Sequence, residues 1–184
     1  GTLREVSRRG GNIVAINPLK ERGLERFQDP QAAVEMMTNG STPISRYYFQ
    51  PNVGGDYALM FGMLKHLREW DIQALAAGKK SVFDRSFIEM NTVGFDAMME
   101  EIDRTAWSDI HAHTGLSPEH LESLAKMYLD AKTAIFCWGM GITQHRHGTA
   151  NVHMLANLML ARGHIGRPGA GLAPIRGHSN VQGD

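Results

Sequence analysis

The strongest constraint on the fold is a pattern that occurs three times along the chain. A short run rich in β-branched and aromatic residues ends at a turn containing Gly or Pro, and a polar or helical stretch follows. The three runs are residues 12–17, 44–49 and 133–138. Each predicts a short strand, and strands that alternate with helices are typical of an α/β fold with a parallel sheet.

Helical periodicity fills the stretches between these strands. Apolar residues recur at helical spacing from Asp56 to Trp70. Ser117-Pro118-Glu119 predicts a helix start, because a hydroxyl cap precedes proline and an acid in the first turn. Further helical segments are expected over residues 2–9, after Asp29-Pro30, in short pieces within 71–114, and from about 148 to 162. Residues 163–184 are rich in glycine and predict a loop.

Charge and cysteine content exclude several classes of protein. Lys+Arg and Asp+Glu both total 19 in 184 residues, so the net charge is zero, which disfavours a nucleic-acid binder that relies on neutralising phosphates. No apolar run reaches the ~18 residues of a transmembrane helix, and no leader-like stretch begins the chain, so we expect a cytoplasmic protein without a membrane segment. The single cysteine, Cys137, excludes an internal disulfide or a site built on several thiolates within this chain.

The ends of the chain do not look natural. Gly1 is followed at once by a helical pattern, and the last residues close a loop without a capping element. We therefore expect a piece of a longer protein.

Ligands of parallel α/β sheets bind beyond the carboxyl ends of the strands, so the residues that follow each strand are the candidates for a site. Asn17 and Pro18 follow the first strand, where a polar side chain can reach a ribose or base, or can instead bond its own backbone in a turn. Gly54-Gly55-Asp56 follows the second. Its free N–H groups suit an anion, its carboxylate suits the two donors of a guanine edge, and the alternative is a helix cap.

The third strand leads into Gly139-Met140-Gly141, ending at Gln144. The third glycine of a dinucleotide fingerprint is missing, which disfavours a nicotinamide-binding Rossmann domain, although the turn still allows the backbone to approach a flat ligand. His145 and His147 chelate a metal poorly at this spacing. Cys137, within the strand, is expected to be a buried core thiol.

The segment from Pro174 to Gly183 carries many hydrogen-bond donors and no amphipathic pattern. Arg176 offers a planar fork to an anionic substrate or phosphate, and the alternative is a solvated loop.

Taken together, these segments resemble the alpha subunits of formate dehydrogenases and related molybdopterin oxidoreductases of the dimethyl-sulfoxide-reductase superfamily. The resemblance covers essentially the whole chain and is weakest over 71–86 and 104–114. It rests on INPLKERGL (16–24), VGGDYALMFGMLKHL (53–67), FIEMNTVGF (87–95), CWGMGITQHRHG (137–148) and ANLMLARGHIGRPGAGLAPIRGHSNVQGD (156–184).

The resemblance implies a large enzyme that holds molybdenum or tungsten between two molybdopterin guanine dinucleotides and carries out two-electron redox chemistry on a small anionic substrate such as formate. It implies a three-layer, Rossmann-like domain, with a mostly parallel sheet and helices on both faces, over residues 1–162. A helical insertion is expected at about 71–114, and 163–184 would be an active-site loop leading to a further part. The metal ligand and any iron–sulfur cysteines lie outside this chain, so the isolated piece is expected to be inactive.

The same resemblance assigns roles to individual residues. The catalytic pair would be Arg176, beside the metal, and His178, which stands where relatives often have glutamine and could move a proton. Asn17 stands where many relatives have aspartate. The positions that match cofactor-binding residues are Asn17, Pro18, Gly54, Gly55, Asp56, Gly139, Met140, Gln144 and Asn180. The alternative is a nucleotide-binding or scaffold module without catalytic activity.

Overall fold

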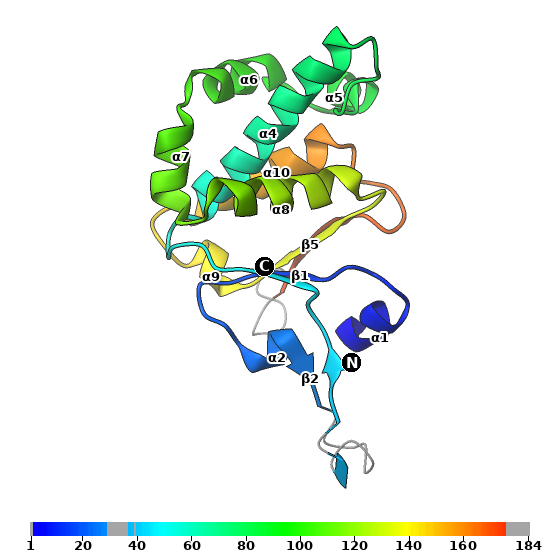
Figure 1. Cartoon of the computed structure of the whole chain (residues 1–184). Helices are drawn as coiled ribbons and strands as arrows, with labels where there is room; N and C mark the ends of the chain where they lie inside the picture. The colour runs from blue at the N-terminus through cyan, green and yellow to red at the C-terminus, as the bar shows by residue number, and fades with distance from the viewer. Residues whose placement is uncertain (1, 29–36, 39, 176–184) are drawn as a thin grey trace, which may run out of the picture. The chain divides into compact units, whose positions relative to one another are not determined.

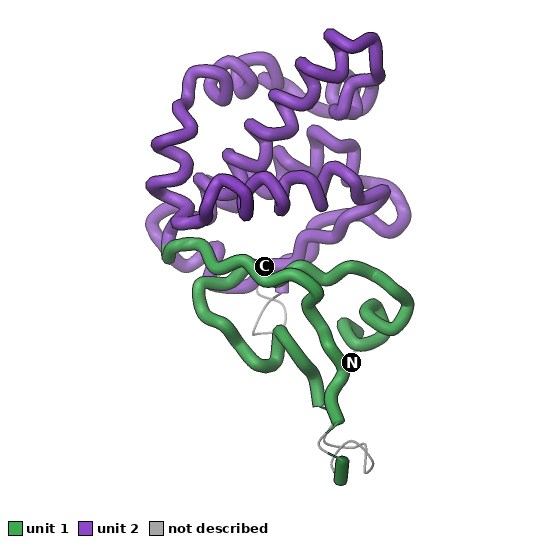
Figure 2. The backbone as a smooth tube through the Cα atoms, in the orientation of Figure 1, with its two compact units in different colours: residues 1–53 green, residues 54–184 purple. Residues whose placement is uncertain are grey.

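The computed structural model describes residues 2–28, 37, 38 and 40–175. The chain divides into two compact units, residues 1–53 and 54–184 (Figure 2). The helix expected after Asp29-Pro30 lies outside the described residues.

The first unit is built on a pair of parallel strands, β1 (Val14–Ile16) and β4 (Tyr47–Phe49), with Val14 opposite Tyr47 and Ile16 opposite Phe49 (Figure 1). A short antiparallel pair, β2 (Arg26–Phe27) and β3 (Thr42–Pro43), lies between them in sequence. Helix α1 (Thr2–Arg8) precedes β1, and α2 (Arg22–Glu25) follows it. The two parallel strands were predicted from the sequence, and β1 is only partly buried: Ala15 is buried, whereas Ile16 is 44% exposed.

The second unit is mainly helical. Its elements are α4 (Asp56–Ala76), α5 (Arg85–Asn91), α6 (Phe95–Arg104), α7 (Trp107–Thr114), α8 (Pro118–Asp130), β5 (Ile135–Trp138), α9 (Met140–Thr143), α10 (Gly148–Ala161) and β6 (Gly171–Pro174) (Figure 1). The predicted cap of α8 is confirmed, because the Ser117 side chain accepts from the backbone N–H of His120.

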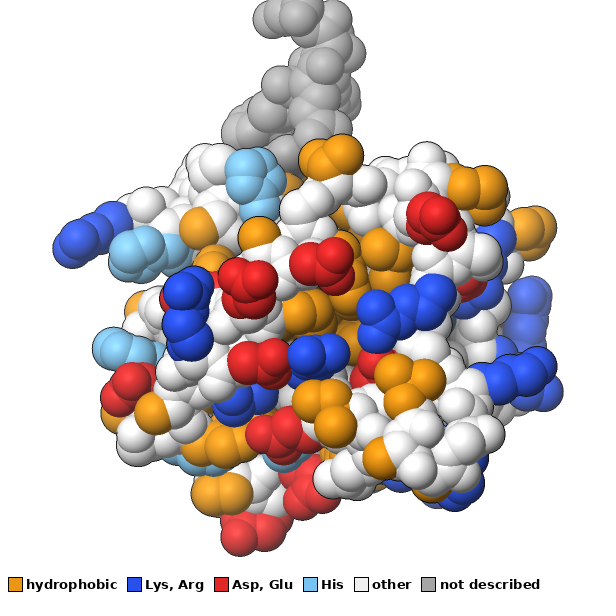
Figure 3. All heavy atoms as spheres, turned by 90° about the horizontal axis from the view of Figure 1, so that it is seen from above, with side chains coloured by type: hydrophobic (Ala, Val, Ile, Leu, Met, Phe, Trp, Pro, Cys, Tyr) orange, Lys and Arg blue, Asp and Glu red, His pale blue; other side chains and the backbone are white. Residues whose placement is uncertain are grey.

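Helix α4 is the centre of this unit, and α6, α7, α8 and α10 pack around it (Figure 1). Gly62 of α4 lets α7 and α8 approach closely: a Cβ there would lie 2.7 Å from Leu121 of α8 and 2.8 Å from Ile110 of α7. The most deeply buried apolar side chains are Leu64, Leu67, Ile102, Leu121, Leu158 and Met159. Such burial contributes most of the stability of a helical layer. On the face seen from above, acidic and basic side chains are mixed, and apolar side chains lie between them (Figure 3).

Two sequence expectations for this unit are corrected. Residues 171–174 form β6, which pairs in parallel with β5, although the stretch 163–184 was predicted to be loop. Cys137 is exposed rather than buried in the core, and Ile135, two residues earlier on the same side of β5, is exposed as well. The α/β class with parallel strand pairs is confirmed, while the described residues form three separate two-stranded ladders.

His164 is a buried imidazole just beyond α10. It is 0% exposed, its ring lies 5.5 Å from the ring of Tyr128, and neither ring nitrogen has a hydrogen-bond partner among the described residues. Burial, followed by the positive charges of Arg167 and Arg162, lowers its pKa to about 4. The ring is therefore neutral in the folded protein at neutral pH.

We expect this burial to make stability depend on pH. In the unfolded chain His164 takes up a proton near its ordinary pKa of 6.5, so folding loses stability as the pH falls from 6.5 toward 4. The loss below pH 4 amounts to about 3 kcal/mol if no other group compensates. Thermal unfolding of the full-length protein at a series of pH values measures it. His164→Leu should flatten the dependence in this range, and an unchanged slope in that variant would contradict the assignment.

Candidate functional site

The turn after β5 carries three of the predicted cofactor-binding residues. The backbone of Gly139 is extended, and α9 begins at Met140. The N–H of Gln144 donates to the carbonyl of Met140 at 2.7 Å, which closes the turn. Met140 is 49% exposed and Gln144 is also exposed, so both side chains are available to a ligand.

The next helix begins tightly against this turn. A Cβ at Gly148 would overlap the backbone carbonyl of Thr143, so glycine is required there. The N–H of Gly148 donates to the carbonyl of His145 at 2.9 Å. The path from α9 into α10 is consequently fixed by backbone contacts.

The start of α4 carries the second group of predicted residues. Gly54 has a φ of +82°, a conformation that favours glycine, and a side chain there would meet nothing within 4 Å. Gly55 occupies the N-cap position without a side-chain cap, so Asp56 lies in the first turn and is not itself the cap. Burial raises the pKa of Asp56, and its own backbone N–H and His145 oppose that rise. The helix N-terminus favours the ionised carboxylate.

The structure brings these two groups together within the second unit. His145 follows Gln144 directly, and its Nε2 lies 3.9 Å from Oδ2 of Asp56. Asn151 of α10, which is 0% exposed, lies behind the ring, with its Nδ2 2.8 Å from the same Nε2. Neither His145 nor Asn151 was predicted from the sequence to lie at the cofactor site. The signal available was Asn151, a polar residue in a mainly apolar helix.

The turn after β1 is ordered by Tyr48 of β4. The Tyr48 hydroxyl donates to the carbonyl of Leu19 at 2.6 Å and accepts from the N–H of Glu21 at 3.1 Å. The side-chain amide of Asn17 contacts the same hydroxyl at 3.5 Å, so Asn17 bonds a neighbouring strand rather than its own backbone. The carbonyl of Pro18 accepts from Gln50 at 3.0 Å. The Asn17-Pro18 turn is thus held in one conformation.

The loop that was predicted to be catalytic begins at the end of β6. The N–H of Ile175 donates to the carbonyl of Trp138 at 2.7 Å, which places Ile175 beside the turn that follows β5. The predicted residues Arg176, His178 and Asn180 lie outside the described residues.

Other candidate features lie apart from these turns. The His145 and His147 rings are 6.3 Å apart, and within residues 2–28, 37, 38 and 40–175 no cluster of three or more His, Cys, Asp or Glu side chains is suited to a metal. Over the same residues, no helix has the length and apolar character needed to cross a membrane. A hollow of about 390 Å³ lies between α4 and α8 and contains none of the predicted site residues. It is lined by Trp70, Glu119, Glu122, Ser123, Lys126 and Leu129.

The chain is thus an α/β chain with polar turns after its parallel strands. A comparison with protein families agrees with this description. The sequence model of the molybdopterin oxidoreductase family matches residues 77–184, and the chain belongs to this family.

Individual relatives extend the comparison to the whole chain. Protein YdeP of Escherichia coli is 50% identical over 183 residues, which are 100% of this chain and 24% of YdeP. Formate dehydrogenase H of Escherichia coli is 34% identical over 105 residues, covering 57% of this chain and 15% of that protein. The chain thus spans about a quarter or less of these relatives.

Among solved structures, acetylene hydratase from Pelobacter acetylenicus matches with a TM-score of 0.66 and 16% identity, covering 90% of this chain and 19% of that chain. At this identity the match concerns the fold alone, and it supports the α/β architecture predicted from the sequence.

Proposed function

We propose that the full-length protein is a molybdenum- or tungsten-dependent oxidoreductase of the formate-dehydrogenase type, and that this chain holds one guanine dinucleotide half of its cofactor. The observation that carries the proposal is one contact: Oδ2 of Asp56 lies 3.9 Å from Nε2 of His145, the residue that follows Gln144. The start of α4 and the turn after β5 are far apart in sequence, and this contact brings polar side chains from both together. The similarity to formate dehydrogenase H supports the reaction type.

The residues present fit a guanine base. A guanine edge presents two donors, N1–H and the 2-amino group, and the two carboxylate oxygens of Asp56 can accept both. Two residues before Asp56, a side chain at Gly54 would meet nothing within 4 Å. Gly139 and Met140 offer backbone and an exposed side chain to the rest of the nucleotide, and Gln144 adds an amide. In the first unit, Asn17 and Pro18 form a second ordered turn for a ribose or base.

The chemistry expected of the full-length protein is the oxidation of a small anion. For formate, HCOO⁻ gives CO₂, one proton and two electrons. The bound metal cofactor supplies the acceptor for those electrons. Arg176 holds the anion through its guanidinium fork, and His178 accepts the proton. Asn180 contributes to holding the cofactor.

The dinucleotide assignment is tested by replacing Asp56 with Asn in the full-length protein. The change puts a donor opposite the donors of guanine, and a hydrogen bond to a charged group contributes about 1.5–3 kcal/mol, so affinity should fall about tenfold to a hundredfold. The measurement is the GMP released per protein on acid hydrolysis. Asp96→Asn is the matched control, because Asp96 also lies in the first turn of a helix but is exposed. Full GMP content in Asp56→Asn would refute the assignment.

A further inference from the structure

We infer that Tyr48 is a positioning residue whose hydroxyl turns the side-chain amide of Asn17, so that the amide oxygen accepts a hydrogen bond from a ribose hydroxyl of the ligand. This inference rests on the proposed function, because the ribose is that of the guanine dinucleotide. It adds Tyr48, which no sequence motif assigned to the site, and it states which atom of Asn17 meets the ligand.

The hydrogen bonds of the Tyr48 hydroxyl show where its proton is. Tyr48 lies on β4, and its oxygen is 2.6 Å from the carbonyl of Leu19, which can only accept. The single hydroxyl proton is therefore directed at Leu19. The same oxygen accepts from the backbone N–H of Glu21 at 3.1 Å. Toward any further neighbour, the Tyr48 oxygen is consequently an acceptor.

Asn17 is that further neighbour. Its Nδ2 lies 3.5 Å from the Tyr48 oxygen, which is long for a hydrogen bond but close enough to decide which way the amide is turned. If the amide were reversed, Oδ1 would face an oxygen that has no proton left to donate. The NH₂ group therefore stays toward Tyr48. Oδ1, to which no described residue donates a hydrogen bond, is left for the ligand.

The backbone of this turn is held by contacts that do not involve the hydroxyl. The N–H of Asn17 donates to the carbonyl of Phe49 at 3.0 Å, and Nε2 of Gln50 donates to the carbonyl of Pro18 at 3.0 Å. Both bonds come from the chain around β4. Removing the hydroxyl of Tyr48 should therefore release the amide of Asn17 while the turn keeps its path.

The same turn is poorly suited to a phosphate. The N–H groups of Asn17 and Glu21 are already used, and Pro18 has none. The ammonium of Lys20 lies 3.1 Å from the carboxylate of Glu25. What the turn offers is an acceptor oxygen, and in dinucleotide-binding folds an acceptor side chain binds the ribose hydroxyl.

The first test uses the full-length protein prepared without cofactor, and two probes, GMP and its 2′,3′-dideoxy analogue. Titration calorimetry gives the Kd of each. We expect GMP to bind about threefold to tenfold more tightly than the analogue, as for one neutral hydrogen bond. This preference should vanish in Asn17→Leu, which keeps the size of the side chain. Equal affinities for the two nucleotides in the unsubstituted protein would overturn the inference.

The second test concerns Tyr48 itself. Tyr48→Phe removes only the hydroxyl, so it should weaken GMP binding about threefold and leave the affinity for the dideoxy analogue unchanged. General damage to the fold would weaken both. Tyr47→Phe is the matched control, because Tyr47 is also a half-buried residue of β4 and its hydroxyl makes no hydrogen bond within the described residues. Equal weakening of both nucleotides in Tyr48→Phe, or none, would overturn the role of Tyr48.

A rescue variant shows whether Tyr48 acts through Asn17. The two oxygens of an aspartate are equivalent, so Asn17→Asp needs no orienting partner. In the Tyr48→Phe background it should restore the preference for GMP over the analogue to at least about that of the unsubstituted protein. A preference that stays low would overturn the inference.

The proposed function can fail separately. If Asp56→Asn binds GMP as tightly as the unsubstituted protein, the guanine assignment of Asp56 is refuted, whatever the preference at Asn17. If the unsubstituted protein prepared without cofactor binds neither nucleotide, the proposed function and this inference are both refuted. Equal affinities for the two nucleotides, together with weaker GMP binding in Asp56→Asn, would overturn only the inference.

Discussion

Replacing Arg176 with alanine in the full-length protein should lower formate-dependent reduction of a dye acceptor by about a hundredfold or more, as for loss of one preorganised charge-stabilising group. The reason is chemical: a guanidinium offers two parallel donors to a carboxylate and keeps its charge at every working pH. The chain reaches position 176 from Ile175, which is bonded to Trp138 at the end of β5, beside the turn with Met140 and Gln144.

Two companion measurements make the Arg176 result specific. Metal and GMP content should stay unchanged in Arg176→Ala, because the arginine is assigned to the substrate and not to the dinucleotide. Arg176→Lys keeps the charge but not the fork, so it should recover only part of the activity. Unchanged turnover in Arg176→Ala would refute the assignment, and so would a loss of activity that merely follows a loss of cofactor.

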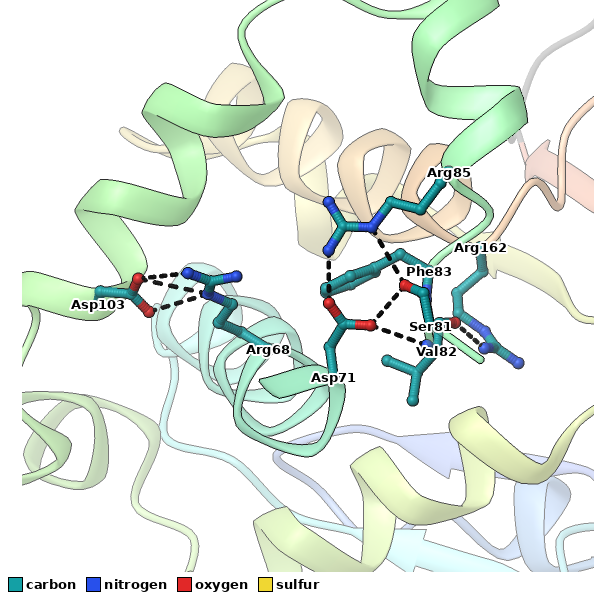
Figure 4. Close-up of polar contacts among 8 residues, drawn as sticks. All are labelled: Arg68, Asp71, Ser81, Val82, Phe83, Arg85, Asp103 and Arg162. Carbon is teal, nitrogen blue, oxygen red and sulfur yellow. Dashed lines mark hydrogen bonds and ion pairs between the residues drawn. The ribbon is translucent and has the colours of Figure 1, made fainter. Parts of the chain in front are cut away.

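The largest effect on stability is expected at Asp71. Its side chain is 0% exposed, and it accepts from Ser81 Oγ at 2.5 Å, from the N–H of Val82 at 2.9 Å and from Arg85 at 2.5 Å (Figure 4). These bonds tie the segment before α5 to the end of α4. Asp71→Ala should lower the free energy of unfolding by about 3 kcal/mol, because it removes the fully buried acceptor of three hydrogen bonds, one of them from a charged group.

The neighbouring substitutions rank below Asp71→Ala. Arg85 is 44% exposed and lies over Phe83 and Phe95, so Arg85→Ala should cost about 1 kcal/mol, since two donors still satisfy the carboxylate. Asp103 pairs with Arg68 on the surface and is itself 44% exposed, so Asp103→Ala should cost less than about 1 kcal/mol (Figure 4). Chemical denaturation of the full-length protein gives the three values. A cost at Asp103 equal to that at Asp71 would contradict this ranking.

Local sequence signals predicted three strands and one helix cap, whose formation depends mainly on neighbouring residues. The strands at 14–16, 47–49 and 135–138 have β-branched and aromatic residues between turn signals, and Ser117 caps α8 as its sequence indicates. Strand β6 was missed because Gly171-Leu172-Ala173-Pro174 has low strand propensity. It forms through pairing with β5, which is a tertiary effect.

In the candidate site, too, some residues could be predicted from the sequence, whereas their contacts depend on tertiary packing. Asp56 and Gln144 follow strand ends and could be selected from the sequence alone. Their association through His145 and Asn151 could not, because it depends on how α4 and α10 pack. The exposure of Cys137 likewise depends on what packs against its face of β5, and a single apolar run carries no information on that point.

We propose above that this chain holds one of the two guanine dinucleotides of the cofactor in a metal-dependent oxidoreductase. The most direct measurement is the metal and nucleotide content of the purified full-length protein, by elemental analysis and by chromatography of the GMP released on acid hydrolysis. Our account predicts molybdenum or tungsten together with about two GMP for each metal atom, as for a metal held between two guanine dinucleotides. Metal-loaded protein that releases no GMP, or protein that never contains either, would contradict it.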